Sequence, residues 1–212
     1  MKKVHVRLLH TTSAKPQDIQ ATLRGIKALE RFGVLVDDCR ITSNKRDDKQ
    51  SLRGVMLGGY IKEVITGREP QVVDFMAEGH RLRDVFAWHS RDTLGFGLMT
   101  GRLSIARHGK VEEVTGSGRF LDIALLSLFN FDDIKDPALR LRAIEVAAKY
   151  EAGHLFRKGH CDQPSCVMQP KPVRLQVALE SIVLRPDLCR TCETEIGRNV
   201  SMREYNLAHV SI

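Results

Sequence analysis

Apolar and polar residues follow two different periods in the first forty positions of the chain. Over Lys3–Leu9 they alternate strictly, which is typical of a strand that buries one face. Over Pro16–Phe32 apolar residues recur every three to four positions, and Gly33 closes the run. This pattern predicts an amphipathic helix with proline near its first turn. The apolar residues of Val34–Ile41 then predict a second strand.

The middle of the chain has weaker periodicity. Val55–Ile65 carries a helical pattern interrupted by glycines, and Val85–His89 is typical of a short strand. Gly95–Ala106 predicts two strands joined as a hairpin by a turn near its centre. The segment that follows, Lys110–Gly118, is polar and rich in glycine, whereas Phe120–Phe131 is apolar enough to be buried.

A long amphipathic helix is predicted from Pro137 to Phe156, where apolar residues recur at helical spacing. Asp136 is suited to cap this helix, and Pro137 falls at its first position. Strands and helices that alternate in this order predict the α/β (α+β) class. The expected fold is a twisted, mostly parallel sheet flanked by helices, in a single domain over residues 1–212.

Composition and charge narrow the class of protein. The chain has 212 residues, of which 42% are hydrophobic. It can therefore form a sizeable hydrophobic core, and a disordered chain is excluded. The net charge of +7 comes from basic residues scattered along the chain, without the clusters or repeated aromatics of a nucleic-acid binder. No apolar run approaches the roughly 20 residues of a membrane helix, and the N-terminus lacks a secretory pattern. We expect a cytoplasmic protein.

Four of the five cysteines form two close pairs in the last quarter of the sequence. The pairs are Cys161 with Cys166 and Cys189 with Cys192. In a reducing compartment such thiols stay free unless a metal holds them. Paired thiolates at this spacing are typical of a tetrahedral structural zinc site, which stabilises the segment that binds it. The alternative is a set of unrelated buried cysteines.

Two histidines and a glutamate lie directly before the first cysteine pair. Glu151 stands one helical turn before His154, and His160 follows six positions later. A histidine at the end of a helix and another just beyond it can converge on one metal if the chain turns between them. Glu151 would then lie where a carboxylate can deprotonate a bound water. The alternative is that both histidines are ordinary surface or core residues.

Together these residues resemble the archaemetzincins, zinc-dependent peptidases of the metzincin clan. The pattern of that family is H-E-x-x-H-x-x-G-x-x-H, followed at once by C-x4-C-x-M and later by C-x-x-C. The chain matches in register at Glu151, His154, His160, Cys161, Cys166, Met168, Cys189 and Cys192. The resemblance implies that His154 and His160 bind a catalytic zinc and that Glu151 is the general base. It also implies a Met-turn at Met168 and a structural zinc on the four cysteines.

The chain departs from the family pattern at two positions. Tyr150 stands where the family has its first histidine ligand, and Arg157 stands at the turn glycine. A phenol loses its proton only at a pKa of about 10, so Tyr150 is a weak zinc ligand or none. Three states remain open: a working site completed by Tyr150 or water, a site filled only at high zinc, and a site without zinc. A distant histidine, His89 first among them, is a further source of the missing ligand.

The resemblance implies a metallopeptidase that hydrolyses peptide bonds with a zinc-activated water. Its peptide or protein substrate would lie along an edge strand expected at Gly95–Ala106. The alternative is an inactive pseudopeptidase that binds a peptide or protein partner and holds the structural zinc alone. A zinc-ribbon-like nucleic-acid binder is the third hypothesis. Residues 1–156 are expected to form the sheet and its helices, and residues 157–212 a zinc-bound C-terminal segment.

Overall fold

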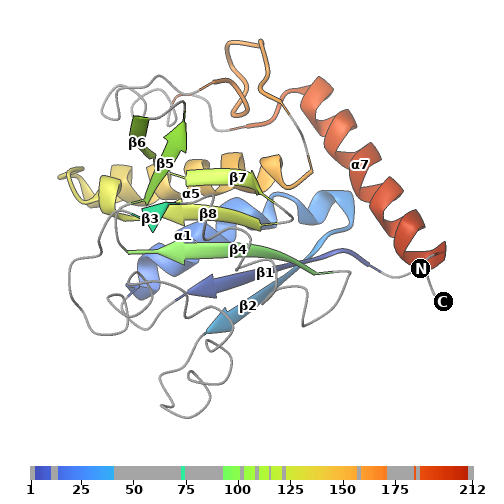
Figure 1. Cartoon of the computed structure of the whole chain (residues 1–212), viewed down its shortest axis with the longest axis horizontal. Coiled ribbons are helices and arrows are strands. Elements are labelled where there is room, and N and C mark those ends of the chain that lie inside the picture. The colour runs from blue at the N-terminus through green and yellow to red at the C-terminus, as the bar shows by residue number, and fades with distance from the viewer. Residues whose placement is uncertain are drawn as a thin grey trace.

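A computed structural model gives the fold of the chain (Figure 1). The structure describes residues 3–10, 14–40, 73–74, 93–100, 103–107, 110–114, 116–120, 123–156, 159–170, 184 and 187–209. The predicted strand Val85–His89 and the predicted helical segment Val55–Ile65 lie outside these residues. So do Arg157, His89 and most of the connection between Met168 and Cys189.

The larger sheet has five strands in the order β2-β1-β4-β8-β7. The strands are β1 (His5–His10), β2 (Leu35–Arg40), β4 (Thr93–Met99), β7 (Gly116–Phe120) and β8 (Ile123–Ser127). Neighbouring strands from β2 to β8 are parallel, and β7 is added antiparallel to β8 at one end. The predicted α/β class and mostly parallel sheet are therefore confirmed.

The burial of the strands follows their sequence patterns. Alternate residues of β1 are buried, as its period of two predicts, because one face of this strand carries the core. All five residues of β8 are buried, which agrees with the apolar run Phe120–Phe131 in which it lies. Both faces of β8 are therefore covered, which is why its sequence is apolar throughout rather than alternating as in β1.

Two long helices lie together on one face of this sheet (Figure 1). Helix α1 (Pro16–Lys27) contacts β1 and β2, whereas α5 (Pro137–His154) contacts β7 and β8, and the two helices pack against each other. Both begin at the proline that the sequence indicated. Between them, the buried carboxylate of Asp18 accepts hydrogen bonds from both terminal nitrogens of Arg140.

Gly25 lets α1 and α5 approach closely. A Cβ atom at this position would lie 2.2 Å from the Glu145 carbonyl oxygen and 2.9 Å from the Lys149 amide nitrogen. Gly25→Ala is therefore expected to destabilise the fold by about 1–3 kcal/mol, because backbone atoms cannot move aside easily. Gly197→Ala is the matched control, since its Cβ would meet Phe32 at an ordinary 3.5 Å. Denaturant unfolding compares them, and equal stability of the two variants would contradict this account.

A smaller sheet of order β3-β5-β6 corrects one prediction. Its strands are β3 (Val73–Asp74), β5 (Leu103–Arg107) and β6 (Lys110–Val114), and β5 pairs antiparallel with β6. The predicted hairpin over Gly95–Ala106 is wrong, because β4 and β5 belong to different sheets. The expected edge strand there is also wrong, because β4 has β1 on one side and β8 on the other. Among the described residues, the two terminal strands of the larger sheet are β2 and β7, and β7 begins at the end of the polar, glycine-rich segment.

The C-terminal helix α7 (Arg190–His209) packs against the short 3₁₀ helix η1 (Glu30–Phe32) that follows α1. A second 3₁₀ turn, η2 (Phe129–Phe131), connects β8 with the segment before α5. Arg31 forms an ion pair with Glu193 at 2.7 Å, and Lys3 with the buried carboxylate of Glu204 at 3.5 Å. The C-terminal helix is thus attached to the N-terminal part of the chain.

Candidate metal centres and active site

The C-terminal half of α5 presents the candidate catalytic residues. The Asp136 carboxylate accepts hydrogen bonds from the amides of Ala138 and Leu139, so the predicted cap starts this helix. Every residue from Val146 to His154 is buried. Helix α1 and the strands β7 and β8 pack against α5, and Met168 and Ile196 lie close to Gly153 near its end.

Three aromatic rings meet where α5 ends. Tyr150 and His154 are one turn apart on the helix, and their ring centroids lie 4.6 Å apart, edge to face. The His160 ring lies 5.3 Å from that of His154 and 6.2 Å from that of Tyr150, nearly parallel to the tyrosine. Tyr150 and His154 are buried, whereas His160 is exposed. The structure thus brings together all three residues that the sequence placed at a catalytic metal.

The two imidazoles are spaced as ligands of one ion would be. With metal–nitrogen bonds of about 2.1 Å and a tetrahedral angle, two ring centroids lie about 5.2 Å apart. The observed 5.3 Å agrees with this value. Among the described residues, no third His, Cys, Asp or Glu converges with this pair. The pair therefore fits a divalent ion, with two protein ligands from histidine.

The Glu151 carboxyl group lies against the terminal strand of the sheet. Its side chain is buried, at 1% exposure. A Cβ on Gly116, the first residue of β7, would lie 2.7 Å from Oε1 of Glu151 and 2.6 Å from the Leu125 carbonyl oxygen. Only glycine allows this approach. The sequence analysis did not single out Gly116, although the Gly116-x-Gly118 pair in a polar segment was the available signal.

Met168 lies under the same helix. It is fully buried, and its sulfur would be 2.5 Å from a Cβ placed on Gly153, the residue before His154. Gly153 thus lets the methionine side chain pack directly beneath the helix at the aromatic rings. The role of Met168 as a Met-turn residue stays a prediction.

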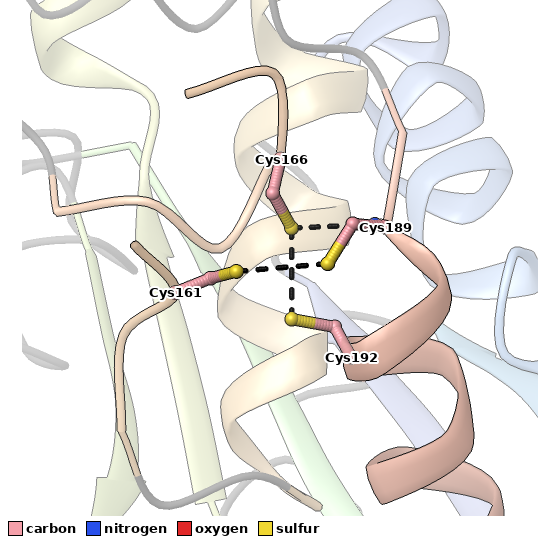
Figure 2. A group of neighbouring side chains, drawn as sticks. All are labelled: Cys161, Cys166, Cys189 and Cys192. Carbon is pink, nitrogen blue, oxygen red and sulfur yellow. Dashed lines mark hydrogen bonds between the residues drawn. The ribbon is translucent and has the colours of Figure 1, made fainter. Parts of the chain in front are cut away.

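The second candidate centre consists of the four cysteines of the C-terminal part (Figure 2). Cys161 and Cys166 lie in the loop after α5, whereas Cys189 precedes α7 and Cys192 lies in its first turn. All four sulfurs point toward a common centre, and they lie within 4.8 Å of one another. We call this set the four-cysteine group. The two pairs found in the sequence are thus brought together.

The sulfur distances fit a tetrahedral ion. Zinc–sulfur bonds of about 2.3 Å place the corners of a tetrahedron about 3.8 Å apart. In the structure, Cys161 Sγ lies 3.6 Å from Cys189 Sγ, and Cys166 Sγ lies 3.6 Å from Cys192 Sγ. Four soft sulfur ligands in this geometry suit zinc or iron, and a shell closed by protein ligands is that of a structural site.

Hydrogen bonds prepare the four-cysteine group for a cation. The Cys189 amide donates to Cys166 Sγ at 3.3 Å, and the Gln163 amide donates to Cys161 Sγ at 3.4 Å. Burial raises the pKa of Cys166 and, more strongly, that of Cys192. Burial also acts on Cys189, but hydrogen bonds from the Cys192 amide and the neighbouring thiols outweigh it and lower the pKa of Cys189 to about 7. A cation at the centre would lower the pKa of the remaining thiols.

The two candidate centres share a scaffold. Cys161 directly follows His160, and its amide donates to the Met168 carbonyl at 2.9 Å. Lys149 of α5 donates to the Asp187 carboxylate at 3.0 Å, a bond that lowers the pKa of Asp187. The Asp187 carbonyl in turn accepts from the Val167 amide at 2.8 Å. A change at the four-cysteine group would therefore be transmitted to the segment that carries His160.

The other described histidines on the sheet have carboxylate partners. His5 hydrogen-bonds Asp37 at 2.9 Å, and His10 hydrogen-bonds Asp38 at 3.1 Å. His89, named above as a replacement ligand, lies outside the described residues.

Comparison with known proteins relates the chain to one family. Over 65 residues it is 35% identical to the archaemetzincin of Methanopyrus kandleri, a match that covers 31% of this chain and 35% of that protein. Over this stretch the chain is homologous to that archaemetzincin. The match spans about a third of the length of this curated relative. No family model matches the chain.

The archaemetzincin fold extends over nearly the whole chain. The crystal structure of the M. kandleri archaemetzincin superposes with a TM-score of 0.60 at 20% identity, covering 94% of this chain and 96% of that one. A zinc-dependent peptidase from Methanocorpusculum labreanum superposes with a TM-score of 0.62 at 16% identity, covering 90% and 99%. Within the part of this homologue that the structure describes, no helix is long and apolar enough to cross a bilayer.

Proposed function

We propose that the chain is a zinc-dependent metallopeptidase of the archaemetzincin type, formed by residues 1–212 as one catalytic domain. The observation that carries this proposal is the imidazole pair of His154 and His160, 5.3 Å apart beside the buried carboxyl group of Glu151. Homology to the archaemetzincins and likeness in fold to a zinc-dependent peptidase support it.

His154 and His160 would hold the catalytic zinc, and the four-cysteine group would hold a structural zinc. When bound, the catalytic ion would polarise the substrate carbonyl and lower the pKa of a bound water. Glu151 would act as the general base toward a water held there and would then protonate the leaving amine, a role that requires a carboxylate fixed in place. Burial of Glu151 against Gly116 supplies this fixation.

An extended peptide is the substrate that fits this arrangement. β7 is one of the two terminal strands of the described sheet, and its first residue, Gly116, lies beside the Glu151 carboxyl group. A peptide that adds to β7 as a further strand would pass the general base while its backbone is held by hydrogen bonds. A zinc site of four thiolates suits a reducing compartment such as the cytoplasm, which we propose for this protein.

A second candidate is a pseudopeptidase that binds peptides without cleaving them. Tyr150 at the place of the first histidine favours it, since no third His, Cys, Asp or Glu joins the pair among the described residues. Two histidines alone bind zinc more weakly than three.

Zinc-dependent proteolysis separates the two candidates. The purified full chain, saturated with zinc, is incubated with unfolded casein and with a set of quenched fluorescent peptides. We expect the chain to cleave these substrates. A chelator should stop the cleavage, added zinc should restore it, and His154→Ala should abolish it. A chain with both metal sites filled that cleaves none of these substrates would overturn the peptidase and favour the pseudopeptidase.

A further inference from the structure

Tyr150 contacts both histidines through its ring. The ring is 6% exposed, packs edge to face on His154 at 4.6 Å, and stacks on His160 at 6.2 Å with an interplanar angle of 15°. Both separations lie within the range of favourable aromatic pairs, about 4.5–7 Å. The same buried ring thus lies within aromatic pairing distance of both candidate ligands.

The geometry of these two pairs is that of ring–ring contacts. Tyr150 and His154 form an edge-to-face pair, with centroids 4.6 Å apart and an interplanar angle of 85°. Tyr150 and His160 are nearly parallel, with centroids 6.2 Å apart. Both relations involve the ring of the tyrosine, and they favour a role for the ring itself.

His160 is the ligand that most needs support. His154 is buried on the helix, whereas His160 is exposed and lies beyond the helix end. An exposed side chain loses rotamer freedom when it is fixed for binding, and a stacked ring reduces that cost because the ring restricts it beforehand. Tyr150 joins the helix to the segment that carries His160.

We propose that Tyr150 is a positioning residue whose ring, and not its hydroxyl group, holds the imidazoles of His154 and His160 in the arrangement that binds one divalent ion. This inference rests on the proposed metal site and adds the role of the residue that replaces the first histidine. The metal site then consists of two histidine ligands supported by an aromatic ring. Such a site exchanges its ion more readily than a site with three histidine ligands.

Three variants at one position test the proposal. The four-cysteine group is first loaded with zinc, and Co²⁺ binding at the histidines is then followed by visible absorption. Tyr150→Phe keeps the ring and should bind Co²⁺ within about threefold of the wild type, whereas Tyr150→Leu should bind at least about tenfold more weakly. Tyr150→His adds an imidazole ligand and should bind at least about tenfold more tightly.

A measurement without metal at the histidines tests the packing directly. In NMR spectra, the ring protons of His160 should be shifted by the ring current of residue 150 in the wild type and in Tyr150→Phe. They should return to ordinary values in Tyr150→Leu.

The proposal is overturned if Tyr150→Phe binds Co²⁺ as weakly as Tyr150→Leu, since the hydroxyl group is then the ligand. It is also overturned if neither change alters binding. If the wild type itself binds no Co²⁺, the proposed metallopeptidase fails. The NMR comparison then tests the ring contact by itself. If the His160 chemical shifts are the same in the wild type and in Tyr150→Leu, the proposed ring contact is overturned as well.

Discussion

Glu151→Gln is expected to lower kcat/KM for peptide cleavage by at least about 100-fold, because a positioned general base contributes about 10²–10⁴-fold. The amide has the shape of the carboxyl group but cannot take a proton from water. The buried place of Glu151 beside Gly116 accepts a side chain of the same size, so the melting temperature should change little. Initial rates with a fluorescent peptide and thermal unfolding measure the two effects separately.

Glu145→Gln is the matched control on the same helix. Glu145 forms ion pairs with Arg24 of α1 and with Arg142, whose side chains are 53% and 43% exposed, while its own side chain is 18% exposed. Surface ion pairs contribute at most about 1 kcal/mol, so this change should affect stability slightly and turnover not at all. Equal rates for Glu151→Gln and the wild type would remove Glu151 as the general base.

Cys192→Ser is expected to release the metal of the four-cysteine group and to detach α7. Cys192 is fully buried, and its sulfur lies 3.6 Å from that of Cys166. Structural zinc binds with about 10–16 kcal/mol at neutral pH, so even partial loss should lower the free energy of unfolding by at least about 3 kcal/mol. Elemental analysis, denaturant unfolding and limited proteolysis of the C-terminal part measure the effect.

The same change should also weaken metal binding at the histidines, because Cys161 directly follows His160 and its amide bonds to the Met168 carbonyl. Ser165→Ala is the control, since Ser165 is exposed in the loop between Cys161 and Cys166. A Cys192→Ser chain with the metal content and stability of the wild type would show that Cys192 is not a ligand, and it would contradict a structural metal held by the four-cysteine group.

Sequence alone predicted those parts of the fold whose patterns are local. Proline and the apolar spacing indicated α1 and α5, and Asp136 caps α5 as predicted. Strict alternation indicated β1. The four cysteines converge because two close pairs in a short stretch leave few other arrangements, and this too was visible in their spacing.

The errors came from long-range pairing. Nothing local distinguishes the central strand β4 from an edge strand, since only its neighbours β1 and β8 decide this. The terminal strand β7 has the sequence GSGRF, and glycines obscure the period-two signal of a strand. The close approach of Gly116 to Glu151 joins residues of different elements, which a single sequence does not reveal.

Helix α7 had a signal that the sequence analysis did not use. Its buried positions recur every four residues, at Cys192, Ile196, Val200 and Glu204. This four-residue period is typical of a helix that buries one face. The charged partner of Glu204 is Lys3, nearly at the other end of the chain, so the burial of a glutamate there is a tertiary effect.

Metal content per chain tests the central claim most directly. The wild type and the double variant His154→Ala/His160→Ala are equilibrated in zinc buffers of rising free concentration, and bound zinc is counted by elemental analysis. The account predicts two zinc ions per wild-type chain at saturation, one on the four-cysteine group and one on the histidines, and a single ion in the double variant. A wild type that binds one zinc ion at every concentration would contradict it.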